Sequence, residues 1–239
     1  TFLMLTPVEK MLFLILVVLA LGATYAGIMQ MIQIINRGQG ELQLSNFFRR
    51  AWNALEIYIT QRTTLKTRRV TSLLHWGVVL GFTYYFLVNA LDFLIGFIPD
   101  FEASLTNLGV IYDGYRLIGD VLSVIVLVGV TYLILRRFYL PNKKELQFHD
   151  NVLLHPKVTQ GAVHRDSLIV AVFILIHIGA RFLGESVNVA QHGADIFMPF
   201  ATLVSPLWTG LNTDGLVMMR HLMWWTALGG IFLFTPYLP

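Results

Sequence analysis

The sequence predicts an all-α membrane protein, a polytopic bundle of five transmembrane helices. Three observations predict it: five long apolar segments, few charged residues, and connecting segments whose charge alternates in sign. Hydrophobic residues make up 56% of the 239 and charged residues 13%, about half the charged share of a soluble domain. The chain has no cysteine, which excludes thiol catalysis and an iron–sulfur cluster held by this chain. Its net charge of +3 is too small to predict a nucleic-acid partner.

Each of the five segments is long enough to cross a membrane, because a helix needs about 20 apolar residues to cross roughly 30 Å of hydrocarbon. The fourth is interrupted by Arg181 and Glu185, whose spacing of four residues also allows them to pair on one helix face. The first lacks the basic leader and small-residue cleavage site of a signal peptide. The predicted spans are Met11–Ile35, Val70–Ile98, Leu117–Leu135, Ser167–Ala190 and Leu216–Leu238.

Charge in the connecting segments predicts the orientation of the spans. The segments after the first and third spans are basic, whereas Asp100–Leu117 and Gln191–Gly215 are acidic, with Arg116 as their only base. The positive-inside rule then places the N-terminus outside and the C-terminus inside. We therefore expect a multi-pass protein of the cell's inner (plasma) membrane, surrounded by lipid. The basic residues are Arg37, Arg49, Arg50, Arg62, Lys66, Arg68, Arg69, Arg136, Arg137, Lys143, Lys144, Lys157 and Arg165.

An amphipathic helix is predicted between the first two spans. Its apolar residues recur at spacings of four, three and four, and polar residues occupy the opposite side. Such a helix either lies in the inner membrane interface or covers the end of the bundle, and in both cases it offers a docking surface for a cytoplasmic partner. The apolar row is Phe48, Trp52, Leu55 and Ile59, and the polar row is Arg49, Arg50, Asn53 and Glu56.

Three of the seven histidines lie at membrane depth: His75, His177 and His221. With a rise of about 1.5 Å per residue, His75 lies roughly 8 Å from the inner edge of its span. His221 lies about as far from the outer edge, and His177 lies near the midplane. The other four are predicted nearer the surface: His149, His155 and His164 in the basic inner segment, and His192 near the outer end of the fourth span.

A histidine at that depth needs a partner, because hydrocarbon cannot hydrogen-bond an imidazole. In helical bundles the partner is often a metal or cofactor, and a haem with two axial histidines suits facing helices. Arg181 and Arg220 are then candidates for binding the haem propionates. One iron atom cannot be held by both His75 and His221, whereas His177 could pair with either. Alternatively, each histidine only hydrogen-bonds a neighbouring helix, and Arg181 pairs with Glu185.

Three stretches resemble a known family. RRVTSLLHWGVVLGFTYYF (Arg68–Phe86) and MMRHLMWWTALGGIFLFTPYLP (Met218–Pro239) resemble the second and fifth helices of the respiratory nitrate reductase gamma subunit family. LILRRFYLP (Leu133–Pro141) resembles the end of that family's third helix. The family includes cytochrome b subunits of heterodisulfide-reductase-like complexes and the membrane domains of larger (Fe–S)-binding reductases.

This resemblance implies a cytochrome with two haems b, which passes electrons between membrane quinone and a cytoplasmic iron–sulfur or flavin redox partner. It implies that His75 is an inner-haem ligand and His221 an outer-haem ligand. Tyr85 stands where the family has a second histidine on helix two, so His177 becomes the candidate partner of His221.

The family has a further histidine shortly after a Pro-aromatic dipeptide, which here is Pro236-Tyr237. We therefore expect residues 1–239 to form a single transmembrane cytochrome b-like domain, the N-terminal part of a longer chain. Iron–sulfur clusters would then belong to a partner or to a following cytoplasmic domain.

The resulting hypothesis is a haem b membrane subunit of a quinone-linked oxidoreductase. Asp113, Arg116 and Asp120 are candidate quinone or proton contacts at the outer side, with His192 a weaker one, although ordinary helix-end charges would give the same pattern. One alternative is a proton-coupled transporter subunit with a relay of histidines and the Arg181–Glu185 pair. The chain lacks the inverted repeat and proline-broken span that many transporters show. A haem-free membrane anchor is the other alternative.

Overall fold

The computed structural model describes residues 4–38, 45–66, 69–140 and 161–239. Over these residues the fold is entirely helical. His149 and His155, for which a solvated position was predicted, lie outside the described residues, as do Arg68, Lys143, Lys144, Lys157 and the end of the Leu133–Pro141 stretch.

Five helices are long and apolar enough to cross a membrane, as the sequence predicts. Four of them are also longer than the predicted segments, because a helix continues through polar residues that an apolar criterion excludes; α4 has the predicted length of 29 residues. Thus Asp113 and Arg136 lie inside the third long helix. The five are α1 (Pro7–Ile35), α4 (Arg69–Phe97), α6 (Val110–Phe138), α7 (Val163–His192) and a composite helix that begins with α9 (Thr213–Trp224).

The composite fifth helix changes its winding in the middle. A π-helical segment, η4 (Trp225–Gly229), follows α9, and then come α10 (Gly230–Phe234) and the 3₁₀ turn η5 (Thr235–Tyr237). Single π turns inside α-helices are rare and are frequent at functional sites. Hydrophobic pattern alone does not reveal such a turn.

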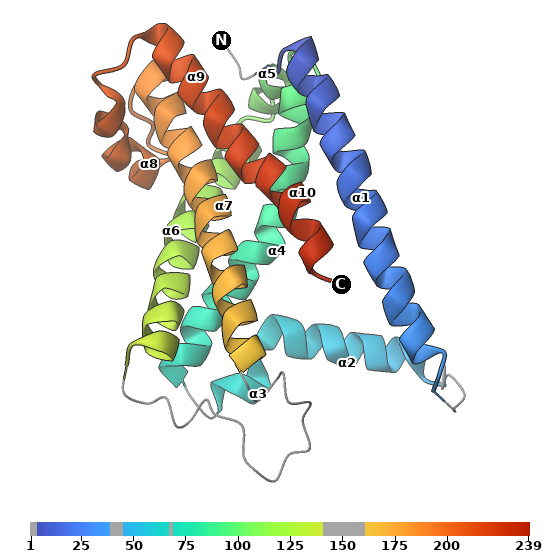
Figure 1. Cartoon of the computed structure of the whole chain (residues 1–239). Helices are drawn as coiled ribbons and strands as arrows, with labels where there is room; N and C mark the ends of the chain where they lie inside the picture. The colour runs from blue at the N-terminus through green and yellow to red at the C-terminus, as the bar shows by residue number, and fades with distance from the viewer. Residues whose placement is uncertain (1–3, 39–44, 67–68, 141–160) are drawn as a thin grey trace.

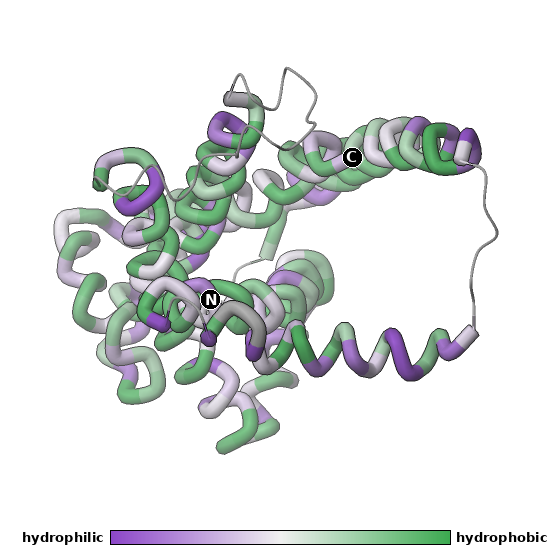
Figure 2. Tube along the Cα trace, turned by 90° about the horizontal axis from the view of Figure 1, so that it is seen from below, coloured by the Kyte–Doolittle hydropathy of each residue, from purple (hydrophilic) through white to green (hydrophobic). Residues whose placement is uncertain are grey.

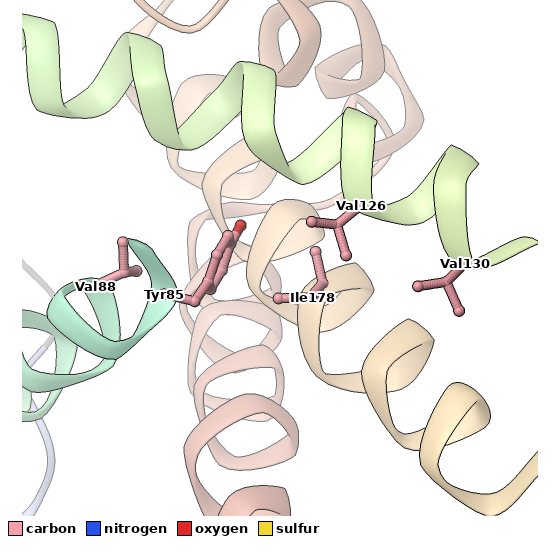
Figure 3. Packing of buried hydrophobic residues seen from close by; sticks show 5 residues of the cluster. All are labelled: Tyr85, Val88, Val126, Val130 and Ile178. Atoms are coloured by element: carbon pink, nitrogen blue, oxygen red, sulfur yellow. The ribbon is translucent and has the colours of Figure 1, made fainter. Parts of the chain in front are cut away.

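The core of the bundle lies between α4, α6 and α7 (Figure 3). Tyr85 and Val88 of α4 pack there with Val126 and Val130 of α6 and Ile178 of α7. A Cβ atom at Gly81 would overlap the side chain of Val126, so α4 and α6 approach each other at a small residue, as membrane helices often do.

A second core holds α1 against the fifth helix. Phe13 of α1 is fully buried, and its ring centroid lies 4.9 Å from that of Trp224 and 5.4 Å from that of Phe232. Phe93 and Phe97 of α4 complete this aromatic cluster. The rest of α1 is largely exposed, as expected for a helix that faces lipid.

Short helices mark the two ends of the bundle (Figure 1). At one, here called the α3 end, α2 (Phe47–Thr60) and α3 (Arg62–Leu65) lie near the first residues of α4 and α7. At the other, the α8 end, lie α5 (Phe101–Thr106), α8 (Pro199–Val204) and the 3₁₀ turn η3 (Ser205–Trp208).

Where the sequence predicts an amphipathic helix, the structure has the helix α2, which lies crosswise to the long helices (Figure 1). Hydrophilic and hydrophobic residues alternate along it (Figure 2), and its apolar row is exposed, with Phe48 at 87%. Its last turn is fastened to α4: Trp76 Nε1 donates to the Ile59 carbonyl at 2.8 Å, and the hydroxyls of Tyr58 and Thr83 lie 2.7 Å apart.

Candidate functional site

His75 lies on α4 near the α3 end, where its imidazole is exposed. Within the described part of the chain, none of the hydrogen bonds involves this ring. It borders a cavity of about 550 Å³ between α4, α6 and α7, which is within the range of roughly 300–1,000 Å³ for ligand sites. His75 is therefore free to bind a group in that cavity.

The walls of the α3-end cavity are mostly apolar, with Val78, Val130 and Ile174 among them. Its charged members are Arg136, Arg137 and Asp166. The Nε atom of Arg137 is buried and has no hydrogen-bond acceptor among the described residues. Tyr237 donates its hydroxyl to Asp166 Oδ1 at 2.8 Å, so the end of the fifth helix reaches this cavity.

His177 is buried near the middle of α7, and both of its ring nitrogens face partners. Nδ1 lies 3.0 Å from the Ala227 carbonyl in the π-helical segment, and because a carbonyl only accepts, Nδ1 carries the proton. Nε2 then faces the Asn89 amide nitrogen at 3.5 Å. Phe173 stacks on the ring at 5.8 Å between centroids. His177 thus makes the helix–helix hydrogen bond of the alternative interpretation.

His221 faces α1. Its Nδ1 lies 2.8 Å from Glu9 Oε1, and Trp225 Nε1 donates to the same oxygen at 3.2 Å. The other oxygen of Glu9 accepts from Thr6 at the start of α1. Neither a hydrogen bond nor a ring contact joins His221 to His177, although both residues are described. The structure therefore does not bring the two histidines together as a ligand pair.

Arg181 is held by two carboxylates at the α8 end. Its Nε donates to Asp92 Oδ2 at 2.9 Å, and its Nη2 lies 3.3 Å from Asp92 Oδ1 and 3.0 Å from Glu185 Oε1. The pairing with Glu185 that the spacing allowed is therefore present. Because these ion pairs occupy the Arg181 donors, they leave little of the guanidinium for a propionate.

Asp92, Arg181 and Glu185 border a second cavity, of about 240 Å³, which lies between α4, α5, α6, α7 and α9. This α8-end cavity also includes Arg116, His192 and Arg220 from the predicted set. Arg220 Nη1 donates to Gln191 Oε1 at 3.4 Å, and His192 Nδ1 to the Asn188 carbonyl at 2.9 Å. Arg116, His192 and Arg220 are thus brought together around one space.

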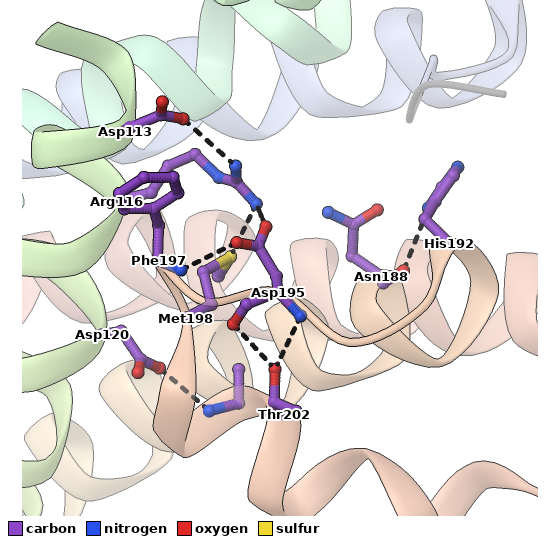
Figure 4. Close-up of polar contacts among 10 residues, drawn as sticks. Asp113, Arg116, Asp120, Asn188, His192, Asp195, Phe197, Met198 and Thr202 are labelled. Atoms are coloured by element: carbon purple, nitrogen blue, oxygen red, sulfur yellow. Dashed lines mark hydrogen bonds and ion pairs between the residues drawn. The ribbon is translucent and has the colours of Figure 1, made fainter. Parts of the chain in front are cut away.

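Arg116 and Asp120 fasten the α7–α9 connection to α6, and Asp113 lies beside Arg116 on α6 (Figure 4). Arg116 pairs with Asp195, and Asp113 lies 3.8 Å from the same guanidinium. Asp120 accepts from the backbone N–H groups of Phe200 and Ala201 at 2.7 and 3.0 Å, in the first turn of α8. Asp113 and Asp120 have structural partners, and of the three only Arg116 borders the cavity.

Sequence reasoning missed Glu102 and Tyr115. Both border the α8-end cavity, and Glu102 Oε2 and the Tyr115 hydroxyl are buried without a hydrogen-bond partner in the described chain. Burial raises the pKa of Glu102, with Arg220 opposing this shift and Glu185 adding to it. A single acid in a short connecting helix gives no pattern, whereas the i, i+3 spacing of Tyr112 and Tyr115 was a visible signal.

Of the two cavities, only the α3-end cavity has features that a haem site would need. The α3-end cavity offers an unpartnered imidazole, mostly apolar walls and an arginine nitrogen without an acceptor. The α8-end cavity, at about 240 Å³, lies below the usual range of ligand sites, and neither His177 nor His221 borders it. Over the described ranges, no three His, Cys, Asp or Glu side chains are grouped to hold a metal ion.

No protein-family model, curated protein or solved structure matches this chain.

Proposed function

We propose that this protein is the haem b-containing membrane subunit of a quinone-linked oxidoreductase, oriented with its N-terminus outside and its C-terminus inside. The orientation is supported by Arg37, Arg62, Arg69, Arg136 and Arg137 at the α3 end, which would be cytoplasmic. The observation that supports the haem is the imidazole of His75, which has no hydrogen-bond partner among the described residues and lies on the wall of a cavity of about 550 Å³.

In this proposal His75 is an axial ligand and Arg137 binds a propionate through its unpartnered Nε. The haem supplies a one-electron couple. The protein's residues orient it between three helices, and the apolar walls keep water from its faces. We place one haem at the α3 end and none at the α8 end, because the cavity there is small and neither His177 nor His221 borders it.

The α8-end cavity suits the ring of a quinone better than a porphyrin. At roughly 30 Å³ per water, its 240 Å³ equals about eight water molecules, the scale of a small ring. Tyr112 and Tyr115 stack with centroids 5.7 Å apart and offer flat faces, and the Tyr115 hydroxyl can donate to a quinone carbonyl. Two electrons would leave a hydroquinone singly, with two protons released at this end.

The cytoplasmic partner would be an iron–sulfur or flavin redox protein with an acidic docking face. The arginines of the α3 end support this, because opposite charges steer association between redox proteins. In the same proposal α2 lies in the inner interface, with its apolar row toward lipid.

The test is the reduced-minus-oxidised absorption spectrum of the purified protein. We expect b-type bands in the wild type, their loss in His75→Ala, and their retention in His221→Ala, the matched control. Partial loss in His221→Ala would instead support the outer haem that the family resemblance implies. A flat wild-type spectrum from a preparation that retains its cofactors would contradict the proposal and favour a haem-free anchor.

A proton-coupled transporter subunit is the second candidate, and the buried Asp92–Arg181–Glu185 cluster favours it. Buried acids and bases inside a membrane bundle often mark ion or proton paths. Proton uptake into vesicles that contain the purified protein, without any redox agent, separates the two. The oxidoreductase proposal expects none.

A further inference from the structure

Two of the unsatisfied polar atoms in the described chain border the same cavity. They are Glu102 Oε2 and the Tyr115 hydroxyl oxygen, both at the α8-end cavity. Buried polar groups in native proteins nearly always have a partner, and an unpaired one usually marks a water or ligand site. Since these two come from different elements, α5 and α6, the space between them is where a partner for both would lie.

We propose that Glu102 is the proton-exchanging residue of the α8-end cavity, which takes a proton from a bound hydroquinone and passes it to water at that end. This inference rests on the proposed function and names the residue that moves its protons. Nothing in the sequence pattern singled out Glu102.

The position of Glu102 suits exchange between a cavity and water. It lies on α5, a six-residue helix outside the five spans, between α4 and α6. The residue as a whole is half-buried, yet its Oε2 is shielded and borders the cavity. One carboxyl is thereby close to both the ligand space and the surface.

The other acidic residues that border the cavity are paired with a base, so Glu102 is the better candidate for proton exchange. Asp92 and Glu185 are ion-paired with Arg181, and Arg116 is paired with Asp195. Burial raises the pKa of Glu102, which brings a carboxyl closer to the neutral range where proton exchange is most efficient. The groups that act on it from α4, α6, α7 and α9 are Asp92, Tyr112, Arg116, Glu185 and Arg220.

The step balances as follows. A hydroquinone O–H bond breaks, an O–H bond forms on the Glu102 carboxylate, and one electron would pass to a one-electron acceptor, for which the haem of the proposed function would serve. The proton then leaves Glu102 for water. The cytoplasmic redox partner would reoxidise the haem before the second hydroxyl reacts in the same way. Each hydroquinone thus yields one quinone, two electrons and two protons.

Reduction of the purified haem-loaded protein by decylubiquinol tests this step in a stopped-flow spectrometer. We expect Glu102→Gln to slow reduction by about 100-fold, the scale of a lost general base. Glu102→Asp should recover part of the rate. Glu56→Gln is the matched control. It removes an exposed carboxylate of α2 that pairs with Arg62 of α3, and it should leave the rate of reduction unchanged.

A second readout needs no turnover. Infrared difference spectra across a pH titration should contain a protonated-carboxyl band in the wild type and Glu56→Gln that is missing in Glu102→Gln. Equal reduction rates and an unchanged band in Glu102→Gln would overturn the inference while leaving the proposed function intact. If decylubiquinol fails to reduce even the wild type, the proposed function fails, and this inference with it.

Discussion

The two ends of the bundle treat their titratable groups in opposite ways. At the α3 end, His75 has no hydrogen-bond partner among the described residues, and its cavity is mostly apolar. At the α8 end, Asp92 and Glu185 are both paired with Arg181, beside a cavity less than half as large. Because unpaired charges are costly at low dielectric, groups that have found partners are structural, and one that has not is the better ligand.

This comparison shows that depth alone does not identify a ligand. His177 is the most deeply placed of the three histidines, yet both its nitrogens face protein groups. His221 contacts Glu9 through Nδ1, and it does not border either cavity. What distinguishes His75 is the cavity beside it, which only the packing of α4 against α6 and α7 reveals.

The largest expected effect comes from breaking the ion cluster of the α8 end. Arg181→Met would leave Asp92 and Glu185, whose side chains are 17% and 26% exposed, without a counter-charge, and we expect it to lower the free energy of unfolding by about 3 kcal/mol, the lower end of the range for a fully buried pair. Arg62→Met, which removes an exposed pair with Glu56, should cost less than about 1 kcal/mol. Unfolding of the detergent-solubilised variants measures both, and equal losses would refute the difference in burial.

The second effect concerns α4 and α6, which border both cavities and approach each other at Gly81. Gly81→Leu would force side-chain atoms into Val126 and separate α4 from α6, at a cost of about 1–3 kcal/mol. Gly22→Leu on α1 is the matched control, since no atom lies within 4 Å of a Cβ there. Its effect should stay within about 0.5 kcal/mol. The thermal midpoints of the two variants give the measurement, and a similar loss in both would contradict the close approach.

A smaller effect is expected where α2 is fastened at the α3 end. Trp76→Phe removes the hydrogen bond to the Ile59 carbonyl and should cost about 0.5–1.5 kcal/mol. The loss should be local, so hydrogen exchange of α2 amides should accelerate while that of α7 stays unchanged. Trp52→Phe keeps the apolar row of α2 and serves as control. Unchanged exchange in α2 would show that this contact does not hold the helix.

The smallest expected effect is a pH dependence of stability at Glu102. Burial raises its pKa in the folded protein, so the folded state binds the proton more tightly than the unfolded state. Stability should therefore fall as the pH rises from the ordinary glutamate pKa, about 4.3, toward the raised value. Glu102→Gln should flatten this part of the profile of thermal midpoint against pH, and Glu56→Gln should not. A profile unchanged by Glu102→Gln would mean that its carboxyl is solvated.

The five spans could be predicted from the sequence because lipid imposes a length and an apolar composition on each of them. The helix α2 was equally visible in its periodicity. These features depend only on the residues of one continuous stretch, so the sequence alone is enough to predict them. The positions of the helix ends were less accurate, because helices such as α6 continue into polar residues.

The partners of the candidate residues could not be predicted, since they come from distant parts of the chain. Asp120 accepts from backbone groups 80 and 81 residues away, and Glu9 meets His221 across 212 residues. No periodicity encodes such contacts. Glu102 was missed for the same reason, because its significance comes from a cavity built by five helices.

The number of haems per chain tests the central claim most directly. A pyridine haemochrome assay on the purified wild type, set against protein concentration from amino-acid analysis, gives this ratio. One haem b per chain is the predicted result, because only the α3-end cavity beside His75 fits it. A ratio of two would mean that the α8 end also binds haem, and a ratio of zero would contradict the account altogether.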